Sequence, residues 1–406
     1  MNRTPQIDTL VIIGNGFDIW QGLDTGYAEF QSYYLAHRDA ILKKLHIKMH
    51  TFISPDGSEM QCSDVELIYG DPFEPGELDK SFWSTFEASL DKIDTERINL
   101  FFGKQKKGLK AMEKSIRNAN RILKKAFCDW IATIELEQRD AGYRFGENCL
   151  FINFNYTDTL VKRFFVDETK EFHIHGEATD SRSIIFGHAS HPQEPEYMLA
   201  RFGGRFLGLF YVDKILYETD KHCQDNIQLL CMFFAMHAVM CEEVKHIYVL
   251  GHSMGPADIE YFDFLVRSTQ IPQSSQDFVQ ETETQPEPME ELYNRIQYVV
   301  ESVGYQNGDV QEKYFDAMGR KLAQEQEERN VMFQQEFMRM LHKKSQGGIG
   351  EECPKLITRR EDAKWHISYH SHKDKEWIDG LMRQLGCRNY ELCHDIEGCI
   401  EEFKSH

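Results

Sequence analysis

The chain lacks any apolar run long enough to cross a membrane, because about 18 such residues in succession would be needed. The apolar stretch from Leu229 to Val239 is far shorter and contains His237. The first residues, Met1 to Thr9, are polar and lack the apolar segment of a secretory signal peptide. We therefore expect a cytoplasmic protein that does not associate with membranes.

Paired cysteines are also missing. None of the ten cysteines forms a CxxC pair, and several fall inside helix-like or strand-like runs. This usage is typical of reduced cysteines in a cytosolic protein and unlike a disulfide framework or a zinc ribbon. Histidines do cluster, but no carboxylate or cysteine completes a metal-ligand set beside them, so we expect no bound metal. The two clusters are His173, His175, His188 and His191, and His366, His370 and His372.

Positive charge is scarce as well. The formal net charge is -20 over 406 residues, of which 41% are hydrophobic and 28% charged. Duplex nucleic acid is bound chiefly through lysine and arginine, so we do not expect it as a partner. Basic residues do gather from Lys104 to Lys125, which we interpret as a solvated helix face. The chain is large enough for one elaborated domain or for two.

An apolar strand that runs into a glycine turn organises the rest of the chain. The strand, Leu10 to Ile13, has no polar alternation, which is typical of a central strand that is buried on both faces of a parallel sheet. The turn after it consists of Gly14, Asn15, Gly16, Phe17 and Asp18. Glycine lets the backbone approach a ligand closely, and the first amides of the next helix can face a phosphate. Ile19 replaces the third glycine of the GxGxxG fingerprint, so a tight turn without a ligand remains an alternative.

Polar or glycine-containing turns follow the other predicted strands too. We expect these strands at 149–153, 172–175, 183–187 and 246–250. The residues at their ends are Asn155 and Asp158, then His175 and Gly176, then Gly187 and His188, and finally Gly251, His252 and Ser253. In a parallel doubly wound sheet, ligands bind beyond the carboxyl ends of the strands. We therefore expect these residues to meet in one site.

Helical sequence separates most of these strands, and two further strands are expected at 365–369 and 390–393. We predict an α/β fold with a Rossmann-like, mostly parallel, doubly wound sheet and large helical insertions. The core would comprise residues 1–268 and 355–406. A helical insertion without strands would occupy residues 30–145, and an acidic linker with a second helical insertion would occupy residues 269–354.

The motifs, in their order along the chain, resemble the AbiH family of bacterial abortive-infection proteins, which act in phage defence. They are IIGNGFDIWQGLDTGYAEF, FWSTFE, NFNYTDTL, HIHG, FGH, YVLGHSMGPADIEYF and WHISYHSHKDKEWIDGL. More distantly, the chain is similar to the sirtuin-like domains that consume NAD. The two resemblances together imply a sirtuin-like fold and a role in defence against phage.

The more distant resemblance also implies a substrate and residue roles. Asn155 matches the asparagine that holds the nicotinamide ribose and a water, and His175 matches the general base. The implied activity is NAD+ hydrolysis at the nicotinamide N-glycosidic bond, for which an asparagine and a histidine have suitable groups. Gly14 and Gly16 would cradle the pyrophosphate, with Gly251 and Ser253 as the far wall. The other residues expected to bind the cofactor are Asn15, Phe17, Asp18, Asp158, Gly176, Gly187, His188 and His252.

Two other functions fit the same sequence. The pocket could bind a nucleotide and signal without turnover, with the insertions contacting a phage protein or another copy of this chain, and we expect a homo-oligomer. Alternatively, Ser253 lies in a GxSxG motif after a strand, the setting of the nucleophile in α/β-hydrolases. Pro256 instead indicates a loop before a helix N-cap at Asp258. A histidine for this chemistry is available at His366, His370, His372 or His394.

Overall fold

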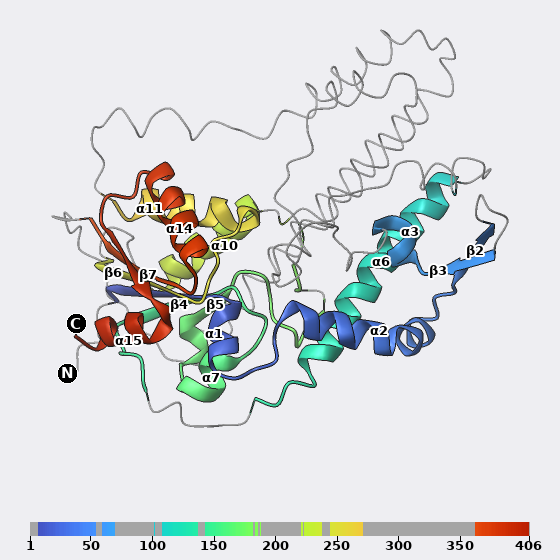
Figure 1. Ribbon diagram of the computed structural model, residues 1–406, viewed down its shortest axis with the longest axis horizontal. Coiled ribbons are helices and arrows are strands. Elements are labelled where there is room, and N and C mark those ends of the chain that lie inside the picture. Colours follow the sequence, from blue (N-terminus) through green and yellow to red (C-terminus); the bar gives the residue numbers. More distant parts are fainter. Residues whose placement is uncertain are drawn as a thin grey trace, which may run out of the picture. The chain divides into compact units, whose positions relative to one another are not determined.

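The computed structural model describes residues 7–53, 59–69, 101, 108–136, 143–181, 183–185, 187, 221, 223–237, 244–270 and 362–405. The described residues up to Thr269 and from Asp362 onward belong to one compact unit (Figure 1). The predicted second insertion, at 269–354, lies outside the described residues, apart from its first two positions. The division of the chain into domains therefore stays a prediction.

Six parallel strands form the central sheet, in the order β5-β4-β1-β6-β7-β8. The strands are β1 (Thr9–Ile13), β4 (Cys149–Asn153), β5 (Glu171–His173), β6 (His246–Leu250), β7 (Lys364–Tyr369) and β8 (Tyr390–His394). Counted along the chain within this sheet, the order is 3-2-1-4-5-6, which is the doubly wound order of dinucleotide-binding folds. The predicted Rossmann-like α/β fold is confirmed. The strand order reverses between β1 and β6, which are paired in register from Thr9 with His246 to Ile13 with Leu250.

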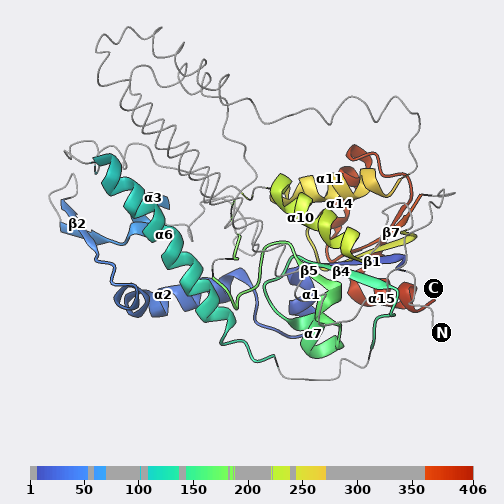
Figure 2. The ribbon, with the colours of Figure 1, turned by 180° about the vertical axis from the view of Figure 1, so that it is seen from behind.

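Helices cover both faces of this sheet, as Figures 1 and 2 show. One face packs against α1 (Asn15–Trp20), α7 (Thr159–Phe164) and α15 (Asp395–Ser405) in a shared apolar cluster. The other face carries α10 (Cys223–Met236), α11 (Ile259–Ser268) and α14 (His372–Gln384). Every residue of β1 and β4 is buried, because both strands are covered on both faces.

The segment between β1 and β4 adds a second apolar core. The described helices that form this core are α2 (Tyr27–Lys44), α3 (Asp64–Tyr69) and α6 (Gly108–Ile131), which bury large side chains such as Phe30, Phe127 and Trp130. The expectation that this segment holds no strands is wrong, since β2 (His50–Ile53) and β3 (Glu59–Cys62) pair as an antiparallel hairpin. Each strand has only four residues, too few for a strand period to stand out in the sequence.

The strand predicted at 183–187 does not form among its described residues. The amide of Ile185 donates to the carbonyl of His175 at 2.9 Å, and the hydroxyl of Tyr156 donates to the carbonyl of Ile185 at 2.8 Å. These bonds attach the segment to the loops at the sheet edge instead of to another strand. Ile184 is fully buried and packs in the second apolar core.

Two further observations concern membrane-spanning helices and the state of the cysteines. No described helix is both long and apolar enough to cross a membrane. The described cysteines are free thiols, as expected from the lack of CxxC pairs.

Candidate functional site

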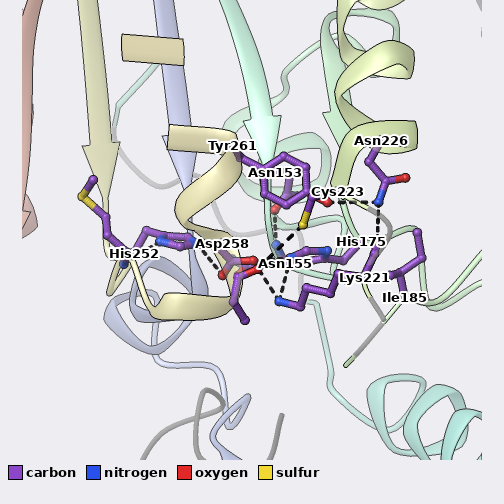
Figure 3. A network of polar contacts seen from close by, with 12 residues as sticks. Asn153, Asn155, His175, Ile185, Lys221, Cys223, Asn226, His252, Asp258 and Tyr261 are labelled. Atoms are coloured by element: carbon purple, nitrogen blue, oxygen red, sulfur yellow. Dashed lines mark hydrogen bonds and ion pairs between the residues drawn. The ribbon is translucent and has the colours of Figure 1, made fainter. Parts of the chain in front are cut away.

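The candidate site lies at the carboxyl edge of the sheet, beyond β1, β4, β5 and β6 (Figure 3). The sequence placed Asn155, His175 and His252 at this edge, and the structure brings them together. The ring of Phe154 lies 5.3 Å from the ring of His175 and 4.3 Å from the ring of His252. The nitrogen Nδ2 of Asn155 donates to the carbonyl of Gly14 at 3.0 Å. The turns after four strands thus converge, as the doubly wound fold predicts.

His175 lies at the centre of this group. It follows β5 and is buried, with 3% of its surface exposed. Its Nε2 atom lies 3.2 Å from Oδ1 of Asp258 and 3.5 Å from Nζ of Lys221, while its buried Nδ1 has no hydrogen-bond partner among the described residues. Burial, followed by the charge of Lys221, lowers the pKa of His175 to about 4. The ring is therefore neutral at pH 7 and can accept a proton.

Asp258 supplies the negative charge of the site. It ends the short helix η3 (Pro256–Asp258) and occupies the N-cap position of α11, as the sequence predicts, but its side chain caps no backbone amide. The carboxylate instead accepts a hydrogen bond from Lys221 at 2.8 Å and lies 3.6 Å from Nε2 of His252. Burial disfavours the charged form, but Lys221 and His175 outweigh burial and hold the pKa of Asp258 well below its usual range. Asp258 is therefore ionised.

Lys221 supplies the matching positive charge and is 1% exposed. Asn226 of α10 anchors the backbone of Lys221. Its Nδ2 donates to the carbonyl of Lys221 and to the hydroxyl of Tyr261, each at 3.0 Å. A buried ammonium is stable only beside a counter-charge, which Asp258 provides. Sequence reasoning missed Lys221, because it belongs to no motif or periodic run. The acid in GHSMGPAD is the sequence signal for Asp258, although the N-cap position alone accounts for an aspartate there.

His252 fills the space directly above the glycine turn. A Cβ on Gly14 would lie 2.6 Å from Cα of His252, and one on Gly16 would lie 2.8 Å from the carbonyl oxygen of Gly251. Nδ1 of His252 accepts a hydrogen bond from the amide of Met254 at 2.8 Å. Burial lowers the pKa of His252 to about 4. The glycines therefore allow the turns after β1 and β6 to touch.

The amides of the glycine turn are largely occupied by this packing. The amide of Gly14 donates to Leu250, that of Gly16 to Gly251, and that of Phe17 to Gly14, at 3.1, 2.8 and 2.9 Å. A pyrophosphate held by these amides would have to replace those carbonyls. The structure therefore gives the glycines a packing role, and their role as a pyrophosphate cradle stays a prediction.

Asn155 links the turn after β4 to the turn after β1. Its backbone amide donates to Oδ1 of Asn153 at 2.7 Å, and its side chain reaches Gly14 across the sheet edge. Its carbonyl accepts from Nδ1 of His173 at 3.0 Å. Burial opposes the protonation of His173, but the charge of Glu171 outweighs burial and raises the pKa of His173 to about 9. His173 and His175 thus have different carboxylate partners and do not form a chelating pair.

The other predicted cofactor-binding residues have varied surroundings. Phe17 is fully buried, and its ring lies 5.1 Å from that of Phe164. Asp18 is also buried and accepts from the hydroxyl of Thr157 at 2.6 Å. Gly176 has a φ of +79°, and a Cβ there would lie 2.0 Å from the carbonyl of Ser183. Asn15 and Asp158 are half-buried, Gly187 is buried, and His188 lies outside the described residues.

The described residues around Ser253 do not form the geometry of a serine hydrolase. A nucleophile elbow is a strained strand-to-helix turn with the serine at its tip. Here the positive φ angles fall on Gly251 and Met254, at 65° and 51°, and the short helix η3 precedes α11. Among the described residues, no histidine is hydrogen-bonded to Ser253, which is exposed.

A second polar cluster lies on the face of the sheet that α15 covers. Ligand atoms of His366, Glu391 and Glu402 lie within 4.8 Å of one another, as a metal site would require. Lys364 already pairs with both carboxylates of this cluster, because its Nζ lies 2.8 Å from Oε2 of Glu391 and 3.8 Å from Oε1 of Glu402. The arrangement is that of an ion-pair network.

The fold and the site together define a Rossmann-like protein with a buried acid–base cluster at the point where the strand order reverses. A family model described as "Bacteriophage abortive infection AbiH" matches residues 10–280. Because the match covers more than half of the chain, the protein belongs to the AbiH family, and its role is in bacterial defence against phage by abortive infection. No curated protein and no solved structure matches the chain.

Proposed function

We propose that this AbiH protein aborts infection by hydrolysing NAD+ at the bond between nicotinamide and ribose. The observation that carries the proposal is the state of His175. It is a buried, neutral imidazole with a carboxylate and an ammonium at one nitrogen and no described partner at the other. A neutral ring with an unoccupied acceptor atom has the form that a general base needs.

The position of the site at the carboxyl edge of the sheet favours a dinucleotide as the substrate. In doubly wound sheets with this strand order, dinucleotides bind across the crevice where the order reverses. That point lies between β1 and β6, whose turns meet at Gly14 and His252. Asn155 links the turn after β1 to the turn after β4, beside the histidine. The sirtuin-like resemblance inferred from the sequence motifs, which is itself part of this proposal, implies the same substrate.

The reaction balances with water as the only co-reactant. The bond from C1′ of the ribose to the nicotinamide nitrogen breaks, and its electron pair leaves with neutral nicotinamide. Water adds to C1′, giving ADP-ribose, and its proton passes to Nδ1 of His175 and then to solvent. Water loses its proton as it joins the oxocarbenium-like centre, and the neutral imidazole of His175 is the group that takes it.

Hydrolysis of NAD+ would explain how the protein aborts infection. A protein that aborts infection must stop its own cell from supporting the phage. Loss of NAD+ would stop redox metabolism throughout that cell. The proposed reaction therefore accounts for the family role with one soluble substrate.

The test is nicotinamide release from NAD+ by the purified protein, alone and with an extract of phage-infected cells as a source of trigger. We expect release by the wild-type protein and a loss of about 100-fold or more in His175→Ala, the size of effect expected for a general base. His372→Ala is the matched control, because that imidazole is 84% exposed on α14. Equal release by wild type and His175→Ala would contradict the proposal. NAD+ binding without release in either condition would indicate the nucleotide-sensing alternative.

A further inference from the structure

We propose that Asp258 is a positioning residue that keeps the proton of His175 on Nε2, so that Nδ1 is the atom that accepts a proton from water. The catalytic consequence rests on the proposed NAD+ hydrolysis, whereas the position of the proton does not. Asp258 reaches the ring from a different element, because it precedes α11 while His175 follows β5.

The two neutral forms of His175 differ in what they leave unsatisfied. With the proton on Nε2, the ring donates to Oδ1 of Asp258 over 3.2 Å and leaves a lone pair on buried Nδ1. With the proton on Nδ1, a buried N–H has no described acceptor, and the lone pair of Nε2 faces a carboxylate oxygen. An unsatisfied buried donor is energetically costly, and hydrogen bonds to charged groups are the stronger ones. The Nε2–H form is therefore favoured.

Lys221 is the one described group that could favour the other form. Its ammonium lies 3.5 Å from Nε2 of His175 and could donate to that atom. It lies closer to Oδ1 of Asp258, at 2.8 Å, in a charged hydrogen bond. The carboxylate is also the nearer partner of the ring, since Nε2 of His175 lies 3.2 Å from Oδ1 of Asp258 and 3.5 Å from Nζ of Lys221. Without the carboxylate, Lys221 should donate a hydrogen bond to Nε2, and the ring proton should move to Nδ1.

His252 approaches the same carboxylate from the opposite turn. Its Nδ1 accepts from the amide of Met254, so its proton is on Nε2, which lies 3.6 Å from Oδ2 of Asp258. An ionised carboxylate has about four acceptor sites, enough for an ammonium and two imidazole N–H groups. Asp258 thus orients the ring of His175 within a set of contacts that also fixes the carboxylate itself.

The experiment locates the ring protons by long-range proton–nitrogen NMR on protein labelled at histidine. The signals of His175 are assigned as those missing from His175→Gln. We expect the Nε2–H form in the wild type and the Nδ1–H form in Asp258→Ala, where kcat for NAD+ should fall about 100-fold or more with little change in KM. Asp263→Ala is the matched control on the same helix, since Asp263 pairs with Arg267 on the surface, and it should leave both readouts unchanged.

Asp258→Ala removes the described carboxylate partner of Lys221, and breaking a buried ion pair destabilises the folded protein. The double variant, Asp258→Ala with Lys221→Met, avoids this outcome, because it removes both charges of the pair together. In Lys221→Met the ring should keep its proton on Nε2. In the double variant the ring should no longer carry its proton on Nε2 alone. A wild-type ring with its proton on Nδ1, or an Nε2–H form that persists in folded protein without Asp258, would overturn the inference. An Nε2–H ring in a protein that never releases nicotinamide would reject the proposed function and leave this inference standing.

Discussion

At the residue scale, Gly14 shows how closely the two central turns approach. The nearest atoms to its missing side chain belong to the backbone and ring of His252. Those atoms cannot move far, because His252 is buried between Phe154 and the carboxylate of Asp258. Any side chain at position 14 would therefore disturb the cluster around His175 as well as the turn.

Gly14→Ala is predicted to lower the free energy of unfolding by about 1–3 kcal/mol, the range typical of an overpacked interior. Gly380→Ala is the matched control, because a Cβ there meets nothing within 4 Å. Since Gly380 lies inside α14, the control should gain about 1 kcal/mol from helix propensity. Urea unfolding measures both. A Gly14→Ala protein as stable as the wild type would show that His252 does not pack against the turn as described.

Asp18 gives the second prediction at this scale. Burial raises the pKa of Asp18 from 3.8 to about 6. Between these values the folded protein binds more protons than the unfolded chain, so stability falls as pH rises through this window and the full cost is present above about pH 6. Asp18→Asn removes this cost, and the oxygen of the amide can still accept from Thr157.

We expect Asp18→Asn to raise the free energy of unfolding near pH 7.5 by up to about 3 kcal/mol, from 1.36 kcal/mol per pKa unit, and to have little effect below about pH 4. Urea unfolding at both pH values tests this. Asp24→Asn serves as the control, because Asp24 is exposed. A gain that is no larger at pH 7.5 than at pH 4 would contradict the assignment of a buried, strained charge to Asp18.

At the element scale, α14 supports the turn that carries His252. The indole nitrogen of Trp377 donates to the carbonyl of Met254 at 3.2 Å. The helix begins with a capping box, in which Ser371 accepts from the amide of Asp374 at 3.1 Å and donates its own amide to Asp374 at 2.9 Å. The cap thus fixes the start of an element that reaches the site.

Ser371→Ala is predicted to lower the free energy of unfolding by about 1 kcal/mol, because one amide of the first turn loses its acceptor. Ser32→Ala is the control, since the Ser32 hydroxyl donates only back to its own helix, at the carbonyl of Ala28. Chemical unfolding compares the two. Equal effects of both changes would mean that the capping box does not stabilise α14.

The sequence predicted the elements whose pattern is local. The strands at 149–153 and 246–250 were located correctly, because each is an uninterrupted apolar run ending in a polar turn. The segment 183–187 has the same local pattern but is hydrogen-bonded to His175, which only the tertiary structure reveals. His175 was found from its place after a strand. Lys221 and Asp258 were not, because their pairing joins positions far apart that share no motif.

At the scale of the whole molecule, the site and the family match coincide. The match over residues 10–280 contains every residue of the cluster, from Gly14 to Asp258. The strands β7 and β8 lie beyond the match, yet they complete the sheet and carry the helix that supports the turn after β6. Within the buried cluster the charges of Lys221 and Asp258 offset each other, although the chain as a whole has a net charge of -20.

The most direct test of the central claim follows NAD+ and nicotinamide by mass spectrometry in bacteria that carry the protein, during infection by a phage that it restricts. We predict that NAD+ falls and nicotinamide rises with the wild-type protein and with His372→Ala. In cells with His175→Ala, NAD+ should stay at the level of uninfected cells and protection should be lost. Full protection by the wild-type protein while NAD+ remains at the uninfected level would contradict the account.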